Sequence, residues 1–143
     1  MGDAPHFDPK NFTQQAYSKR YEKPWGYEIH WVTPDTPYMG KVIHINEGCK
    51  LSLQVHDKKQ ESMFLISGRA KLIWENNKGD IIETELQQGK GYTIAIGQKH
   101  RLAGITDCDV IEASTPEMGT TWRLEDDYAR PDETEDQRKK ERS

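Results

Sequence analysis

Apolar and polar residues alternate along much of the chain, and the repeat of two residues is clearest between positions 51 and 66. Leu51, Leu53 and Val55 fall on one face of such a segment, and the polar residues between them fall on the other. After a polar turn at 57–60, the pattern resumes from position 61. This alternation predicts two short β-strands, each with one face directed toward a protein interior.

The same periodicity recurs from position 22 to position 124, and no amphipathic helical window competes with it there. Turns rich in Gly, Pro and Asn interrupt the alternation at regular intervals. We expect about ten short strands, and hence an all-β sandwich or barrel. Beyond the two strands above, they include 22–32, 38–46, 69–75, 80–86, 109–114 and 120–124, with another short strand ahead of Gly97.

Three side chains near the turn at 57–60 have the chemistry of metal ligands. If the two flanking strands pair as a hairpin, Gln54, His56 and Glu61 converge on one face. Imidazole suits zinc or iron, and oxygen donors suit manganese. The alternative for this stretch alone is a polar hairpin end with one surface histidine.

A second segment, 89–100, contains a short strand that a Gly turn stops, with His100 directly after it. Together the two segments resemble the paired motifs of the cupin superfamily. Gln54 departs from the usual pattern, since a His is common there, and Ala95 stands where Pro is common. The positions that match are Gly48, His56, Glu61, Gly68, Gly89, Gly97 and His100.

The resemblance implies an all-β, single-domain cupin jelly-roll β-barrel with short polar terminal extensions. It also implies one divalent metal ion inside the barrel. Zinc is the expected ion, with iron, manganese or nickel as alternatives. The ligands implied are Gln54, His56, Glu61 and His100.

A narrower resemblance is to the cupin domain of type II phosphomannose isomerases. It rests on the segments 23–27, 51–56, 66–68, 99–102 and 123–130. Gln-x-His is also the ligand pairing of phosphomannose isomerases generally, so Gln54 fits this family. The departures are Asp57-Lys58, Ser62-Met63 and Ala129, and most lie close to the site, where they bear on the substrate more than on the metal.

This resemblance implies an aldose–ketose isomerase that acts on a phosphorylated hexose such as mannose 6-phosphate. A metal would polarise the carbonyl, a base would move the proton, and a basic residue would hold the phosphate. Lys58, in the turn between the ligand strands, is the candidate catalytic residue. Lys41 and Arg130 align with basic positions in the family and are candidate substrate contacts. For each of the three, the alternative is a solvated surface charge.

Two other function classes stay open. One is a different metal-dependent cupin enzyme, a dioxygenase or lyase, that uses the same four ligands. The other is a non-enzymatic cupin that binds a sugar or nucleotide sugar. The remaining histidines lack a partner at ligand spacing and are expected to be structural or exposed; they are His6, His30 and His44.

The 143 residues suit one domain, which we place at 21–130 between a loose arm at 1–20 and a polar tail at 131–143. The tail is expected to be a short solvated helix or disordered, without a part in the chemistry. A formal charge of −4 without a basic stripe argues against nucleic acid and membrane partners. Cys49 and Cys108 follow no disulfide spacing, and no signal or membrane-spanning segment appears. A cytoplasmic protein with reduced thiols is therefore expected.

The outward faces of the two ligand strands predict an assembly. One carries Leu51, Leu53 and Val55, and the other carries Phe64 and Ile66. An outer strand face that meets water is usually polar, so these apolar faces should be covered. The segment around 24–25 could fold over them, or a second subunit could. We expect a symmetric homodimer through these faces.

Overall fold

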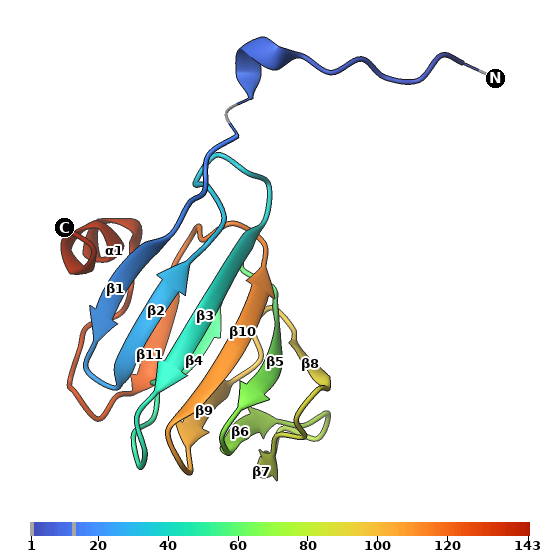
Figure 1. The fold of residues 1–143 in the computed structure, drawn as a ribbon. Helices are drawn as coiled ribbons and strands as arrows, with labels where there is room; N and C mark the ends of the chain where they lie inside the picture. Colours follow the sequence, from blue (N-terminus) through green and yellow to red (C-terminus); the bar gives the residue numbers. More distant parts are fainter. Residues whose placement is uncertain (1, 13) are drawn as a thin grey trace.

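The computed structural model describes residues 2–12 and 14–143. Eleven strands within these residues form two antiparallel sheets that pack face to face (Figure 1). One sheet has the strand order β1-β2-β3-β10-β5-β8, and the other has the order β11-β4-β9-β6-β7. The predicted all-β, single-domain sandwich is confirmed.

The strand boundaries agree closely with the predicted segments, except near the N-terminus and at residues 100–104, where the structure has a strand that was not among the predicted segments. The six-stranded sheet contains β1 (Lys19–Lys23), β2 (Gly26–His30), β3 (Met39–Ile45), β10 (Cys108–Ser114), β5 (Glu61–Ser67) and β8 (Gly91–Ile94). The five-stranded sheet contains β11 (Thr121–Glu125), β4 (Leu53–His56), β9 (His100–Gly104), β6 (Ala70–Glu75) and β7 (Ile81–Glu85).

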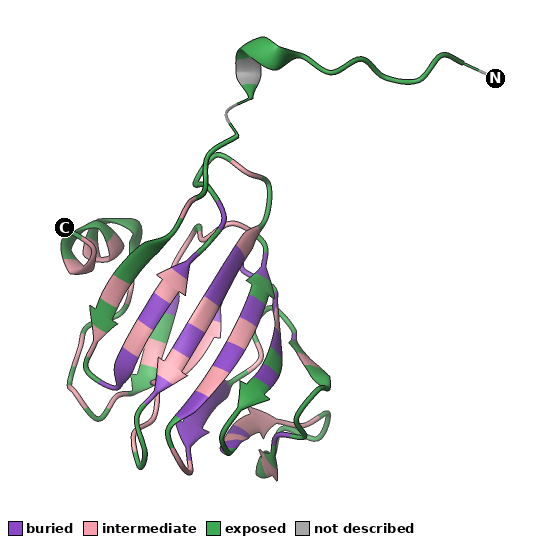
Figure 2. Cartoon of the chain, viewed as in Figure 1, coloured by how far each residue is buried: buried purple, intermediate pink, exposed green. Residues whose placement is uncertain are grey.

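The period of two in the sequence places the core between the sheets. In β5, Glu61, Met63 and Leu65 are buried, whereas Phe64 and Ile66 are 43% and 38% exposed. Figure 2 shows this alternation as bands of buried and less buried residues along the strands of the six-stranded sheet. The buried apolar cluster consists of Trp25, Ile43, Ile45, Met63, Leu65, Ala70, Leu72, Leu86, Ile94, Leu102, Cys108 and Val110.

The predicted hairpin between β4 and β5 is wrong. β4 pairs with β9 and β11, whereas β5 pairs with β10 and β8, so the two strands belong to different sheets. The turn at 57–60 crosses from one sheet to the other. Four extended residues span roughly 13 Å, enough to bridge the spacing of about 10 Å between stacked sheets. The ligand residues therefore face one another across the sandwich, and the two apolar outer faces lie on opposite sides of the molecule.

The predicted strand at 22–32 is instead a hairpin of β1 and β2. Pro24 interrupts the strand because it lacks a backbone N–H. Gly26 follows at a φ of 156°, and a Cβ there would collide with the carbonyl oxygen of His44. Trp25, at the turn, is only 2% exposed and packs in the core. The expectation that this segment covers an outer strand face is therefore wrong.

The two terminal segments differ in how they meet the barrel. The N-terminal arm contains the short 3₁₀-helix η1 (Pro9–Asn11) and runs away from the sheets (Figure 1). The C-terminal tail forms α1 (Glu135–Glu141), whose first turn is capped by Thr134 Oγ1, which accepts from the N–H of Gln137 at 3.1 Å. Of the two states that the sequence left open for the tail, the structure shows the helix.

α1 lies beside β1 and β11, the edge strands on one side of the sandwich (Figure 1). Thr121 of β11 forms a backbone bridge with Glu133, and the Arg142 guanidinium lies 5.4 Å from the ring centre of Tyr21 in β1. The helix covers two exposed strand edges at once. Its partly buried residues are Gln137, Arg138, Glu141 and Arg142.

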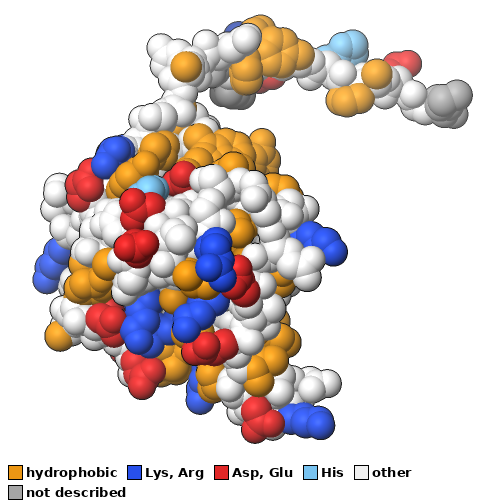
Figure 3. Space-filling view, turned by 60° about the horizontal axis from the view of Figure 1, so that its bottom comes forward, with side chains coloured by type: hydrophobic (Ala, Val, Ile, Leu, Met, Phe, Trp, Pro, Cys, Tyr) orange, Lys and Arg blue, Asp and Glu red, His pale blue; other side chains and the backbone are white. Residues whose placement is uncertain are grey.

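Figure 3 shows basic and acidic side chains interspersed over the end of the molecule that lies at the bottom of Figure 1. Both cysteines are free thiols, Cys108 buried and Cys49 partly so. No helix in the described part of the chain is long and apolar enough to cross a membrane.

Candidate metal centre and adjoining cavity

Three buried side chains converge from three strands in the interior of the sandwich. His56 ends β4, Glu61 begins β5 and His100 begins β9. Their ligand atoms all lie within 4.8 Å of one another. Glu61 Oε1 is 2.7 Å from His100 Nε2 and 3.4 Å from His56 Nε2. We call these residues the triad.

Each histidine of the triad is held by its other ring nitrogen. His56 Nδ1 lies 2.8 Å from Thr121 Oγ1, and His100 Nδ1 lies 2.8 Å from the carbonyl oxygen of Gln98, to which it donates. These bonds leave both Nε2 atoms directed at Glu61. His56 Nε2 is buried without a hydrogen bond. Two imidazole nitrogens and a carboxylate, oriented in this way, fit a divalent ion such as Zn²⁺, Fe²⁺ or Mn²⁺.

Gln54, the fourth predicted ligand, lies next to the triad. It is the register partner of His100 between β4 and β9. Its Oε1 accepts from Ser52 Oγ at 2.9 Å, and its Nε2 is 3.5 Å from His100 Nε2. The amide therefore presents its nitrogen to the triad and must turn over to offer its oxygen. The Ser52 hydroxyl suits both orientations because it can donate or accept.

The charges around the triad favour the ligand forms of its members. Burial raises the pKa of Glu61, but the Lys59 ammonium and the neighbouring imidazoles of His100 and His56 outweigh it and keep that pKa well below its ordinary value. Burial lowers the pKa of His56, which favours the neutral imidazole that a metal needs. Glu61 is thus a carboxylate and His56 a neutral imidazole, so neither has to lose a proton before it binds a metal ion.

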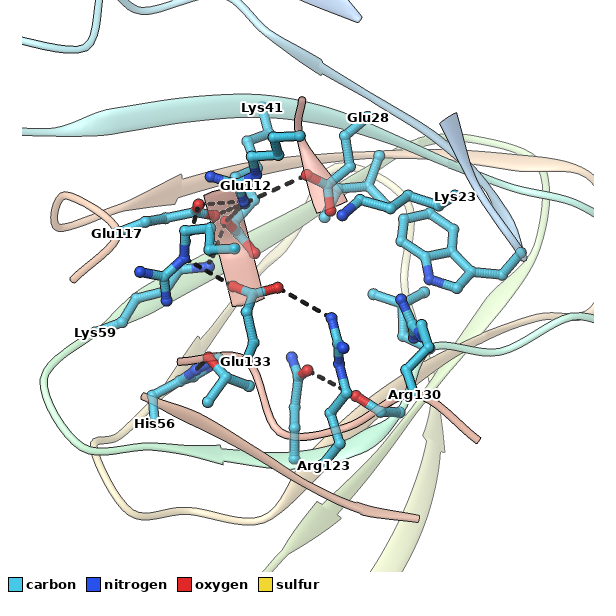
Figure 4. A pocket seen from close by; sticks show the side chains of 18 residues that line it. Lys23, Glu28, Lys41, His56, Lys59, Glu112, Glu117, Arg123, Arg130 and Glu133 are labelled. Atoms are coloured by element: carbon cyan, nitrogen blue, oxygen red, sulfur yellow. Dashed lines mark hydrogen bonds and ion pairs between the residues drawn. The ribbon is translucent and has the colours of Figure 1, made fainter. Parts of the chain in front are cut away.

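A cavity of about 50 Å³ adjoins the triad, with Gln54 and His56 in its wall. Seven basic and four acidic side chains line it, so its lining favours an anion (Figure 4). The basic residues are Lys23, Lys41, Lys59, Arg123, Arg130, Arg138 and Arg142, and the acidic ones are Glu28, Glu112, Glu117 and Glu133.

The two predicted substrate contacts both line this cavity but differ in their partners. Lys41 is 3% exposed, and its ammonium is shared by Glu28 at 3.5 Å, by Glu112 at 3.8 Å and by Glu117. Arg130 is paired with Asp126, Nε to Oδ2 at 2.9 Å. The positive charge of Lys41 is therefore matched by three carboxylates, and that of Arg130 by one.

The predicted catalytic residue, Lys58, is exposed and does not belong to the cavity lining. Its neighbour Lys59 is 8% exposed and lies in the cavity wall. Lys59 Nζ is 3.1 Å from Glu61 Oε2 and 3.1 Å from Glu112 Oε2. The role of Lys58 stays a prediction, while the structure brings Lys59 to the triad. The two-residue repeat could have indicated Lys59, because positions 59 and 61 lie on the same side of an extended chain.

Glu112 is a second residue that the sequence analysis did not select. It lies on β10 between the buried residues Val110 and Ser114, so its side chain points into the sandwich. Burial and the negative charge of Glu61 raise the pKa of Glu112 to about 7. A glutamate at an inward position of a strand was the available signal, because a buried carboxylate needs a partner.

The C-terminal tail also contributes to the cavity, although we expected it to have no part in the site. Arg138 and Arg142 of the α1 region both pair with Glu117, Arg138 at 3.8 Å. Glu133 accepts from Arg138 Nε at 2.9 Å and from Arg123 Nη2 at 3.0 Å. The buried face of the tail is therefore charged and not apolar. A pattern of apolar residues in the sequence does not indicate such a face.

The remaining histidines lie outside the triad, as expected. His30 is buried and bonded to Glu28 at 2.9 Å. His44 is bonded to Asp109 at 2.8 Å and stacks on Tyr27. His6 is exposed in the N-terminal arm. The first two have structural partners, and none of the three lines the cavity, although the partner of His30, Glu28, does.

The two facing sheets, with an internal His-Glu-His triad, define a cupin. Residues 10–133 match the family described as mannose-6-phosphate isomerase C-terminal, and the chain belongs to that family. Both the superfamily and the narrower family indicated by the sequence motifs are therefore confirmed. No curated protein gave a significant sequence match.

Solved structures with the same fold include three proteins of low sequence identity. KdgF from Halomonas sp. matches with a TM-score of 0.59 and 16% identity, over 69% of this chain and 88% of that one. The capsular polysaccharide assembling protein CapF from Staphylococcus aureus matches with a TM-score of 0.60 and 16% identity, over 89% of this chain and 34% of that one. Oxalate decarboxylase from Bacillus subtilis matches with a TM-score of 0.65 and 14% identity, over 82% and 35%. The chain thus spans about a third of the last two proteins, and these likenesses establish the fold.

Proposed function

We propose that this chain is a metal-dependent cupin enzyme that interconverts the aldose and ketose forms of a phosphorylated hexose such as mannose 6-phosphate. The observation that carries the proposal is the triad beside a cation-rich cavity, in a chain of the mannose-6-phosphate isomerase family. The triad supplies a metal site, and the cavity supplies a place for an anionic substrate.

A divalent ion at the triad would act as a Lewis acid toward the sugar carbonyl and the enediolate that follows. His56, Glu61 and His100 would hold it, with Gln54 as a fourth ligand once its amide has turned. The imidazoles favour zinc or iron, and the oxygen donors also admit manganese. CapF and KdgF share this fold but are different proteins, so the fold alone does not determine which metal is bound.

The chain's own residues would perform the remaining tasks. Arg130 and Lys23 lie together on one side of the cavity, away from His56 and Lys59 (Figure 4). That separation suits a substrate whose phosphate meets Arg130 and Lys23 while its carbonyl end meets the triad. Lys41 would support this arrangement by holding Glu28 and Glu117 in place.

Proton transfer between adjacent carbons needs a group beside the metal. Glu112 is the candidate, because its pKa is raised to about 7 and it lies 3.1 Å from Lys59, whose ammonium is also 3.1 Å from Glu61. Lys59 itself cannot accept the proton, because Glu112 and Glu61 raise its pKa and keep it charged. A buried ammonium at this point can also stabilise negative charge on the substrate oxygens.

A coupled assay with mannose 6-phosphate tests the proposal. The purified protein, loaded with zinc and separately with manganese or iron, should form fructose 6-phosphate, and the His56→Ala variant should not. Absence of turnover of any hexose or pentose phosphate by fully metallated protein would contradict it. Oxygen uptake by the iron-loaded form would then favour an oxygenase, and sugar-phosphate binding without turnover would favour a binding protein.

A further inference from the structure

Two cavities lie one behind the other at the side of the sandwich that α1 covers. The inner cavity, of about 50 Å³, adjoins the triad, and the outer cavity, of about 230 Å³, is bounded by α1 and the β1–β2 turn. Lys23 and Arg130 line both of them, so the two cavities are neighbours. The lining of the outer cavity is Glu22, Lys23, Pro24, Arg130, Gln137 and Glu141.

One ion pair joins the linings of the two cavities. Arg123, on β11, lines the inner cavity, and Glu141, at the end of α1, lines the outer one. Their contact is bidentate, with Nη2 to Oε1 at 3.0 Å and Nη1 to Oε2 at 3.2 Å. The Arg123 side chain is 4% exposed. A two-pronged guanidinium–carboxylate contact is among the stronger polar contacts in proteins, so this pair is an effective barrier.

The inner cavity is too small for a substrate while this pair is closed. A water molecule needs roughly 10–15 Å³ of such space, so the inner cavity has room for only a few waters. Pockets that bind small molecules usually begin at about 300 Å³. The inner and outer cavities together come close to that size. A ligand that reaches the triad therefore requires the two to merge, and Arg123 and Glu141 stand between them.

One half of the barrier, Glu141, belongs to a part of the chain beyond the family match. That match ends at residue 133, whereas α1 spans Glu135–Glu141. The helix is also anchored by charges, through Arg138 to Glu133 at 2.9 Å and through Arg142 to Glu117. These contacts are between charges, so an anion can replace a carboxylate partner on a guanidinium, which an apolar seam would not allow.

We propose that the Arg123–Glu141 ion pair is a gate, which an anionic ligand opens by taking the place of the Glu141 carboxylate on Arg123. A tetrahedral oxyanion and a carboxylate fit the same guanidinium fork. Glu141 is then an internal competitor for the anion site, and α1 sets how readily that site is reached. The choice of a phosphate-like ligand rests on the proposed function, whereas the gate itself rests on the two cavities and the pair between them.

Calorimetric titration of the full-length, metal-loaded protein with inorganic sulfate, at constant ionic strength, tests the gate. Sulfate shares the shape of a phosphate group and coordinates divalent metals weakly. Glu141→Gln should bind sulfate on the order of tenfold more tightly than the wild type, because the competing charge is gone. Asp136→Asn removes the same charge from the exposed side of α1 and should match the wild type. Equal affinities of Glu141→Gln and the wild type, including no binding by either, would overturn the proposal.

Trypsin digestion gives a second readout that does not depend on affinity. Arg138 is 11% exposed in the closed state, and its release would open a cleavage site in α1. Sulfate should therefore accelerate cleavage after Arg138 in the wild type, and unchanged cleavage at saturating sulfate would overturn the gate. Neither measurement involves turnover, so a failure of the isomerase assay leaves both results interpretable.

Discussion

Thr121 Oγ1 lies 2.8 Å from His56 Nδ1, which fixes the orientation of a triad histidine from a neighbouring strand of the same sheet. The bond leaves His56 Nε2 directed at Glu61. We expect Thr121→Val to weaken metal binding by about tenfold, because the imidazole loses its orienting partner. Competition with a chromogenic chelator measures this, with Thr120→Val as the control. Equal affinities of the two variants would show that the hydroxyl does not orient the ring.

The ligand set itself can be tested by metal content. His56→Ala should abolish stoichiometric binding, since it removes a nitrogen that points into the triad. Gln54→His should retain the ion, because it restores the more common cupin ligand at a position next to His100. Elemental analysis after dialysis against metal-free buffer gives the stoichiometry, with His44→Ala as the control. Full occupancy in His56→Ala would rule out the triad as the metal site.

Substituting each of the two adjacent lysines of the β4–β5 turn distinguishes two candidates for a role in catalysis. Lys58 is the residue predicted from the sequence, and Lys59 is the residue that lies beside the triad. Lys59→Gln should lower kcat by about a hundredfold or more, because it removes the buried ammonium beside Glu61. Lys58→Gln should change kcat by less than about twofold, since Lys58 is exposed. Steady-state kinetics on variants with matched metal content decide between them. The reverse ranking would restore the role predicted for Lys58.

The free energy of unfolding should decrease at low pH because Glu133 becomes protonated. Burial raises the pKa of Glu133, but the charges of Arg142 and Arg138 outweigh it and lower that pKa from 4.5 to about 2. Because the folded-state pKa lies below the unfolded one, the carboxylate stabilises the fold fully above about pH 4.5, and this contribution is lost as the pH falls toward 2. The shift corresponds to a contribution of about 3 kcal/mol to the free energy of unfolding near neutral pH.

Urea denaturation near pH 7 and near pH 3 measures this effect. Glu133→Gln should lower the free energy of unfolding near pH 7 and should also lose less of it on acidification than the wild type does. Glu135→Gln, on the exposed side of α1, is the matched control. An acid dependence of Glu133→Gln equal to that of the wild type would exclude this residue as its source.

The homodimer stays a prediction, and the structure shows which face to test. Across the outer side of the six-stranded sheet, register pairs align Ile29, Val42, Ile111 and Phe64 in one apolar row. We expect a sedimenting dimer that Phe64→Asp dissociates, since a charge would be buried in the interface. Leu53→Asp, on the opposite sheet, should leave it intact. A monomer at micromolar concentration for the unmodified chain would contradict the expectation.

Much of this architecture can be predicted from local pattern. The alternation at 53–56 and 61–66 correctly assigns which side chains point inward, because the period of a strand is fixed by its geometry. Leu51, predicted on the outer face, instead precedes β4 and packs against the core. The spacing from His56 to Glu61 and the Gly turn before His100 indicate a shared site. The pairing of strands is not encoded in the same way. A four-residue turn can close a hairpin or cross between sheets, and the sequence alone led to the hairpin.

The charged parts of the site were harder to predict. Lys59 and Glu112 are buried and Arg142 is partly buried, although residues of these types are usually solvated. Each is explained by a partner that is distant in sequence, such as Glu117 for Arg142. A pattern that marks apolar faces cannot reveal a face that consists of paired charges. For the same reason the tail appeared solvated, although it forms part of the cavity wall.

The origin of the triad in two different sheets has a consequence for the lifetime of the protein. Glu61 belongs to one sheet and the two histidines to the other, so an ion bound by all three would join the layers that separate on unfolding. Binding to the native state alone raises the unfolding free energy by about 4 kcal/mol when the free ion is at roughly a thousand times its dissociation constant. The metal supply during synthesis would then govern the rate at which the chain is degraded, as well as its chemistry.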